Sequence, residues 1–160
     1  MLSVLPSLFI LSLVALAALR LSKTRPPIHV YTKARTSAVR ALGFAVLLQA
    51  LHFCEEAMTG FHERFPALLG LPAMPFSLFI AFNLLLLGIW IAAIPGLRVA
   101  SPMAFFAAWF LAIAGMLNGI AHPLLAIAAN GYFPGLASSP YIGGAGIWLW
   151  LQLRKATRAG

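Results

Sequence analysis

Acidic residues are almost absent from this sequence, which holds three Asp and Glu against 11 Lys and Arg in 160 residues and has a formal net charge of +8. Charged residues make up only 9% of the chain, hydrophobic residues make up 62%, and the mean hydropathy is +0.95. A soluble domain is usually about one quarter charged. This composition excludes an ordinary soluble fold and predicts an integral membrane protein whose main surroundings are the lipid bilayer.

Cysteine is nearly absent as well, because Cys54 stands alone. A single thiol excludes a disulfide within the chain and a metal site built from cysteines alone. The basic residues flank apolar runs and form no continuous basic face, so the positive charge does not indicate a nucleic-acid partner.

Long apolar runs dominate what is present. A membrane-crossing helix needs about 20 apolar residues, and five segments approach that length: 2–19, 38–58, 76–94, 103–129 and about 136–153. The last is the weakest, since its first half contains serines, a proline and three glycines. We therefore predict an all-α membrane helical bundle of about five transmembrane helices, forming a single domain over residues 1–160. The first segment lacks a positive n-region, so we do not expect a cleaved signal peptide.

The basic residues also predict the orientation of the helices. Cytoplasmic loops retain Lys and Arg, and ten of the 11 fall at one side of the five-span arrangement: Arg20, Lys23, Arg25, Lys33, Arg35, Arg40, Arg98, Arg154, Lys155 and Arg158. This pattern places the N-terminus outside and the C-terminus in the cytoplasm, as in a bacterial inner membrane protein. The four tryptophans (Trp90, Trp109, Trp148 and Trp150) fall toward the cytoplasmic ends, as in an interfacial aromatic belt.

Few strongly polar side chains interrupt the apolar segments: Gln49, His52, Glu55, Glu56, Asn83, Asn118 and His122. At 1.5 Å per residue, His52, Asn83 and His122 each lie about 9 to 10 Å below the outer ends of their segments. The polar residues of the second segment also share one face of the helix at 100° per residue. We predict that three helices bring polar groups to one depth in the outer half of the membrane.

Neighbouring carboxyl groups at that depth carry an energetic penalty. An ionised carboxylate near the bilayer centre costs about 2.5 to 3.5 kcal/mol, and no Lys or Arg lies at the level of Glu55 and Glu56. Their charge requires a bound cation, a protonated histidine or protonation of one glutamate.

Two short motifs resemble a known family. His52-Phe53-Cys54-Glu55-Glu56 reads as His-x-x-Glu-Glu, and Tyr132-Phe133-Pro134-Gly135 reads as Tyr-x-Pro-Gly. In this order they resemble the HXXEE domain family of small multipass membrane proteins, over residues 38–153. The family pattern implies a further functional histidine between the motifs, which matches His122 best and His62 second. It implies no particular reaction, and Tyr132, Pro134 and Gly135 suit a tight turn at the outer interface.

Our leading hypothesis is a metal-dependent enzyme that acts on a lipid or another apolar substrate. His52, Glu55 or Glu56, and His122 would bind a divalent metal, with zinc or iron suited to imidazole and carboxylate ligands. Gln49, Asn83 and Asn118 would support the site, and the second glutamate could serve as a general base.

Two other functions remain open from the sequence alone. A metal-free pair of glutamate and histidine could shuttle protons and act as an isomerase or cyclase of apolar lipids. A chain of 17.2 kDa could also be a non-enzymatic accessory subunit of a larger membrane complex, with the polar cluster joining its helices.

Overall fold

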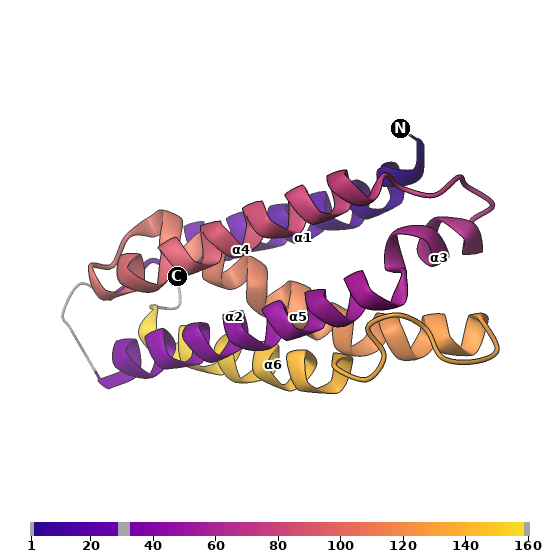
Figure 1. Ribbon diagram of the computed structural model, residues 1–160. Coiled ribbons are helices and arrows are strands. Elements are labelled where there is room, and N and C mark those ends of the chain that lie inside the picture. The colour runs from indigo at the N-terminus through magenta and orange to yellow at the C-terminus, as the bar shows by residue number, and fades with distance from the viewer. Residues whose placement is uncertain (1, 29–32, 159–160) are drawn as a thin grey trace.

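The computed structural model describes residues 2–28 and 33–158, and these parts of the chain are helical with no strand among them (Figure 1). A 3-10 turn at Leu2–Val4 is followed by α1 (Leu5–Thr24), α2 (Lys33–Thr59), α3 (Phe61–Leu68), α4 (Phe76–Arg98), α5 (Pro102–Ala128) and α6 (Ser139–Ala156). The long helices alternate in direction, and the short α3 lies where α2 ends. The predicted all-α bundle is confirmed.

Local sequence signals explain where several helices begin and end. Prolines occupy the first turns of α1, α5 and α6, where the missing amide hydrogen costs nothing because no intrahelical acceptor is available. The short connection from α4 to α5 contains Ala100 at φ 56°, and Asn130 at φ 52° follows α5. Asparagine adopts this left-handed conformation more readily than most residues, so it suits the end of a helix.

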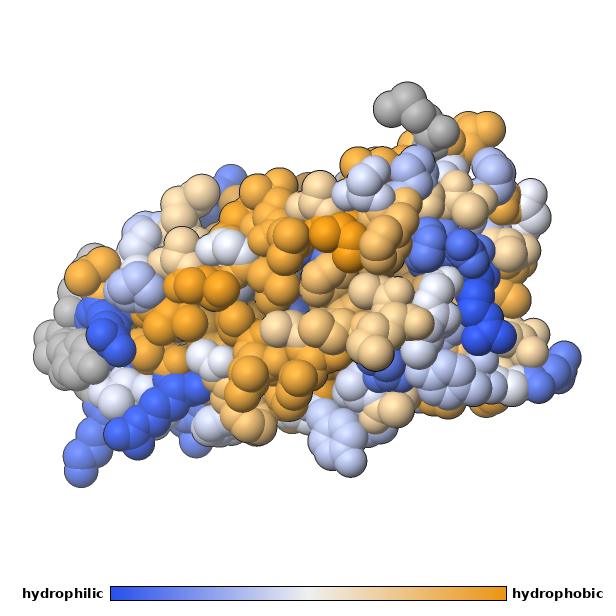
Figure 2. Space-filling model, viewed as in Figure 1, coloured by the Kyte–Doolittle hydropathy of each residue, from blue (hydrophilic) through white to orange (hydrophobic). Residues whose placement is uncertain are grey.

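Four helices are long and apolar enough to cross a membrane: Leu2–Thr24, Lys33–Thr59, Phe76–Arg98 and Pro102–Ala128. The fifth predicted segment forms α6, which begins at Ser139 and is 18 residues long. It is not among the four, because its glycines and the charged Arg154 and Lys155 make it less apolar. The view in Figure 2 has a hydrophobic middle with hydrophilic residues gathered toward the two ends, as a membrane protein requires.

Helix α5 is the centre of the bundle. It packs against α6, α1, α4 and α2, and it supplies the largest share of the buried apolar core, including Phe105, Trp109 and Leu111. α2 contacts α6 and α4. α1 packs on α5, whereas α1 and α4 have no comparable contact with each other among the described residues.

The predicted aromatic belt is wrong for two of its four members. Trp109 is fully buried and Trp90 is 4% exposed, so both belong to the core of the bundle. The ring of Trp109 lies edge-on to that of Trp150, with centroids 4.9 Å apart. The sequence places Trp90 and Trp109 toward the ends of α4 and α5, but it does not show that neighbouring helices cover them.

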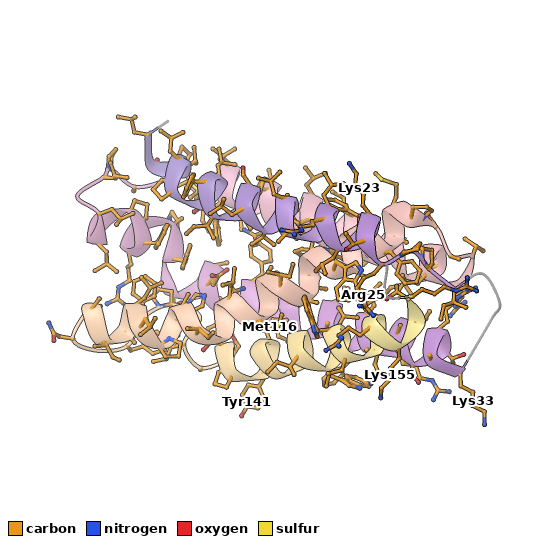
Figure 3. All side chains as sticks on the ribbon, turned by 180° about the vertical axis from the view of Figure 1, so that it is seen from behind. Lys23, Arg25, Lys33, Met116, Tyr141 and Lys155 are labelled. Carbon is orange, nitrogen blue, oxygen red and sulfur yellow. The ribbon has the colours of Figure 1, made fainter. Side chains whose placement is uncertain are left out.

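Basic residues gather at one end of the bundle. Lys23, Arg25, Lys33 and Lys155 all lie in the same half of the molecule in Figure 3. Arg25 donates hydrogen bonds to the hydroxyl of Thr157 and to the carbonyl of Arg154, so the end of α1 is tied to the end of α6. The polar cluster described below lies toward the opposite end, where α2 meets α3.

Glycines allow α5 and α6 to approach closely. A Cβ atom added at Gly146 would lie 2.7 Å from the carbonyl oxygen of Ala112, and one at Gly119 would lie 2.9 Å from the Cα of Gly143. Small residues at such a crossing are typical of helix pairs in membranes.

We therefore expect Gly146→Ala to destabilise the protein by about 1 to 3 kcal/mol, because the added methyl group meets rigid backbone. Gly144→Ala is the matched control: it lies two positions away on the same helix with open space around it, and alanine improves helix propensity. Thermal unfolding in detergent micelles measures the difference. Equal midpoints for the two variants would contradict the close packing.

Candidate functional site

The helix α2 presents a buried polar stripe. Gln49, His52 and Glu56 are spaced by three and four residues, so they lie on one face of the helix, and all three are buried. His122 comes from α5 and is also buried. The predicted inward-facing stripe and its meeting with a histidine from another helix are both present in the structure.

Glu56 lies between the two histidines. Its Oε1 is 3.6 Å from Nε2 of His52 and 3.4 Å from Nε2 of His122, and the two imidazole rings stand nearly perpendicular with centroids 4.6 Å apart. His52 is 0% exposed, His122 2% and Glu56 7%. Each of the three offers one ligand atom, and these atoms all lie within 4.8 Å of one another.

The other ring nitrogen of His122 fixes its tautomer. Nδ1 lies 2.6 Å from the carbonyl oxygen of Pro134, and because a carbonyl oxygen can only accept, Nδ1 must donate its hydrogen. In the neutral ring, Nε2 then carries a lone pair, and this lone pair faces Glu56.

His52 is oriented in a similar way through a serine. Its Nδ1 lies 2.7 Å from the hydroxyl oxygen of Ser138, and that hydroxyl donates to Oε2 of Glu55. The serine oxygen therefore accepts from His52 Nδ1, which leaves the Nε2 of a neutral ring as a lone pair. This buried Nε2 has no hydrogen-bond partner among the described residues. Two nitrogen lone pairs and a carboxylate oxygen thus converge on one point.

Glu55 has a different set of partners from the ones we predicted. Its Oε1 accepts from the hydroxyl of Tyr132 at 2.6 Å and from the amide of Ala137 at 2.9 Å, while its Oε2 accepts from the amide of Ser138 at 2.8 Å and from the Ser138 hydroxyl. The sequence prediction grouped Glu55 with the metal ligands and catalytic residues. The structure uses its carboxylate to hold residues 132–138, which we call the motif segment, against α2.

Desolvation, and then the hydrogen bond to Glu55, raises the pKa of Tyr132. The phenol therefore stays protonated at neutral pH and remains a donor to the carboxylate. Four donor groups surround Glu55 and stabilise its charge.

The motif segment packs directly on the two imidazoles. Gly135 has φ 86°, and a Cβ atom there would lie 2.5 Å from Cε1 of His122 and 2.8 Å from Cε1 of His52. Only glycine combines this backbone conformation with that approach. The glycine of the Tyr-x-Pro-Gly motif is thus a requirement of the site, in addition to the turn that we predicted for Pro134 and Gly135.

Sequence reasoning missed Ser138. Ser138 is one of the serines that make the fifth apolar segment weak as a membrane span, and a hydroxyl three residues after the motif glycine is the signal in the sequence that points to it. The amide of Ala137 could not have been identified, since any residue except proline supplies it.

The three predicted supporting residues are not part of the group formed by His52, Glu56 and His122. Gln49, Asn83 and Asn118 line the wall of a neighbouring cavity. The side-chain amide of Asn83 donates to the carbonyl of Phe79 on its own helix, and the buried Oε1 of Gln49 has no partner among the described residues.

The structure distinguishes the two candidates for the histidine expected between the motifs. His122 lies in the cluster with Glu56, whereas His62 lies on α3 with its Nε2 3.4 Å from Oε1 of Glu63. The His62 ring also packs against Phe76, with centroids 4.9 Å apart.

Beside the cluster is a cavity of about 410 Å³ bordered by α1, α4, α5 and parts of α2 and α3. Its wall is mostly apolar, and it includes Glu56 and His122 but not His52. The side chains of Glu56 and His122 therefore border the cavity. The motif segment packs on both histidines through Gly135.

No family model, curated protein or solved structure matches this chain.

We expect Gly135→Ala to destabilise the protein by about 1 to 3 kcal/mol or more. Alanine is strained at this positive φ, and its methyl group would overlap both imidazole rings. Gly131→Ala is the matched control, since it precedes the same segment, has open space around it and lacks positive φ. Thermal unfolding tests stability, and nitrogen NMR of labelled histidine tests whether both Nδ1 atoms remain protonated. A Gly135→Ala protein with native stability and tautomers would refute the packing.

We expect Glu55→Gln to loosen the motif segment and to cost about 1 to 3 kcal/mol, because hydrogen bonds to a charged acceptor are replaced by weaker ones and one amide group cannot accept at both positions. Glu63→Gln is the control, because the side chain of Glu63 is 67% exposed. Limited proteolysis between α5 and α6 and thermal unfolding measure the change. Equal proteolysis of both variants would show that Glu55 does not anchor the segment.

Proposed function

We propose that the protein is a membrane-embedded, metal-dependent enzyme that acts on an apolar substrate. The metal site consists of Nε2 of His52, Nε2 of His122 and a carboxylate oxygen of Glu56. The observation that carries the proposal is the convergence of these three buried acceptor atoms, with both Nδ1 hydrogens directed elsewhere.

The spacing of the three atoms supports a metal. In a tetrahedral zinc site with bonds of about 2.0 to 2.1 Å, neighbouring ligand atoms lie about 3.3 Å apart, close to the 3.4 and 3.6 Å from Glu56 to the two histidines. Hydrogen bonds between such groups are usually about 2.7 to 3.2 Å long. The distances therefore favour a shared cation over the metal-free glutamate and histidine pair.

The surroundings of the ligands also support the assignment. Metal-binding histidines usually donate their other ring hydrogen to a carbonyl or a carboxylate, which fixes the tautomer and orients the ring. Here Pro134 supplies the carbonyl, and Ser138 relays the hydrogen bond to the carboxylate of Glu55.

Two histidines and one carboxylate suit zinc or iron. Three protein ligands leave a further position open, as in catalytic sites, and the metal would supply Lewis-acid stabilisation of charge on a substrate oxygen. Glu56 and His122 border the cavity, so we propose that the open position faces this cavity and that the substrate reaches it there.

We further propose that the chain spans a bacterial inner membrane with the C-terminus in the cytoplasm and the N-terminus outside. The gathering of Lys23, Arg25, Lys33 and Lys155 toward one end supports this orientation (Figure 3). The cluster then lies in the outer half of the membrane.

We also propose that the chain belongs with the HXXEE domain family. Contacts between its two motifs support this: Gly135 and Pro134 of one motif meet His52 of the other and the intervening His122.

Purified wild-type protein is expected to hold about one divalent metal ion per chain by elemental analysis. His52→Ala, His122→Ala and Glu56→Gln should each reduce the metal content at least about tenfold, because a site with two remaining ligands binds weakly. His62→Ala is the control histidine, and it should keep its metal. The Glu55→Gln variant should retain more metal than the Glu56→Gln variant, because Glu55 contacts His52 only through Ser138.

Wild-type protein that is free of metal, and remains so after incubation with zinc or ferrous iron, would refute the proposed site. Equal metal content in His62→Ala and His122→Ala would also refute it. Correct folding of each variant is checked by thermal unfolding.

A further inference from the structure

The cavity beside the cluster is polar at one end and apolar at the other. Its lining on α5 runs from His122 past Asn118 to Ala114 and Phe110. The twelve residues from His122 to Phe110 correspond to about 18 Å along the helix axis. Below the level of Asn118 this lining is apolar, and Trp90 and Phe110 close the far end with ring centroids 6.1 Å apart.

The cavity is elongated. Its volume of about 410 Å³ extends along about 18 Å of α5. Because most of this length is lined by apolar side chains, it suits an extended hydrocarbon chain of a lipid.

One wall of the cavity faces the lipid. Leu8 of α1 and Leu78 of α4 both line the cavity, and both are 44% exposed. These two helices make no extensive contact with each other among the described residues. A lipid chain can therefore enter sideways between α1 and α4 without crossing water.

We propose that this cavity binds a hydrocarbon chain of a membrane lipid, inserted between α1 and α4, with the part of the molecule next to its polar group held at Glu56 and His122. The substrate class rests on the proposed enzyme function, whereas the binding of the chain does not. Glu56 and His122 are the charged and titratable groups on the cavity wall, and neither Lys nor Arg lines it, so in the metal-free protein a neutral polar group such as an alcohol suits this end better than a carboxylate.

A photoreactive hexadecanol with a diazirine in the middle of its chain tests the proposal in purified full-length protein. Mass spectrometry should locate cross-links on Trp90 and Phe110, which are buried and out of reach of the lipids surrounding the protein. Excess unlabelled hexadecanol should remove these cross-links.

Ala114→Phe places a ring in the middle of the cavity and should lower labelling of Trp90 and Phe110 about tenfold or more. Ala128→Phe is the matched control, because Ala128 is exposed at the end of the same helix. Val14→Phe on α1 narrows the same cavity from the opposite wall and serves if Ala114→Phe does not fold. Both blocking variants should keep the wild-type metal content.

Cross-links confined to lipid-facing residues, or labelling of Trp90 and Phe110 that Ala114→Phe and Val14→Phe leave unchanged, would overturn the proposal. The two proposals fail separately. Labelled Trp90 and Phe110 in a protein that binds no metal would refute the metal site alone, and a metal-loaded protein without these cross-links would refute the chain site alone.

Discussion

The attachment of the motif segment to the carboxylate of Glu55 is the interaction on which the rest of the site depends. Four hydrogen bonds hold residues 132–138 against α2, and this position brings the Pro134 carbonyl to His122 and the Ser138 hydroxyl to His52. Both histidines then point their Nε2 lone pairs at Glu56. Without the attachment, nothing in the described structure selects this tautomer for both rings.

The two glutamates show how adjacent residues on one helix acquire separate roles. They are 100° apart around α2, so Glu55 faces the motif segment while Glu56 faces the cavity and the histidines. A buried carboxylate must be compensated by donors or by a cation. Glu55 has its donors in two amides and two hydroxyls. Among the described residues, Glu56 has no such hydrogen bond, and the Nε2 atoms of the two neutral histidines face it as acceptors. This contrast favours a cation beside Glu56.

Helical periodicity explains why part of the site was predictable from the sequence. Spacing along α2 placed Gln49, His52 and Glu56 on one face, and depth along α5 brought His122 to the same level. Periodicity gives no information about irregular backbone, so it could not show that Gly135 touches both rings or that Ser138 joins Glu55 to His52. For the same reason the burial of Trp90 and Trp109 was missed, since it depends on where helices cross.

The closure of the site by Gly135 also determines which side of the cluster is accessible. The motif segment lies so close to the imidazoles that a methyl group does not fit between them, and His52 is fully buried. The remaining free side of the cluster is the one where Glu56 and His122 border the apolar cavity. A cavity lined mainly by apolar side chains excludes water, which strengthens electrostatic interactions within it. In the proposed enzyme, a reactant would therefore come from the membrane interior, and one that dissolves only in water would have to leave its hydration shell to reach Glu56.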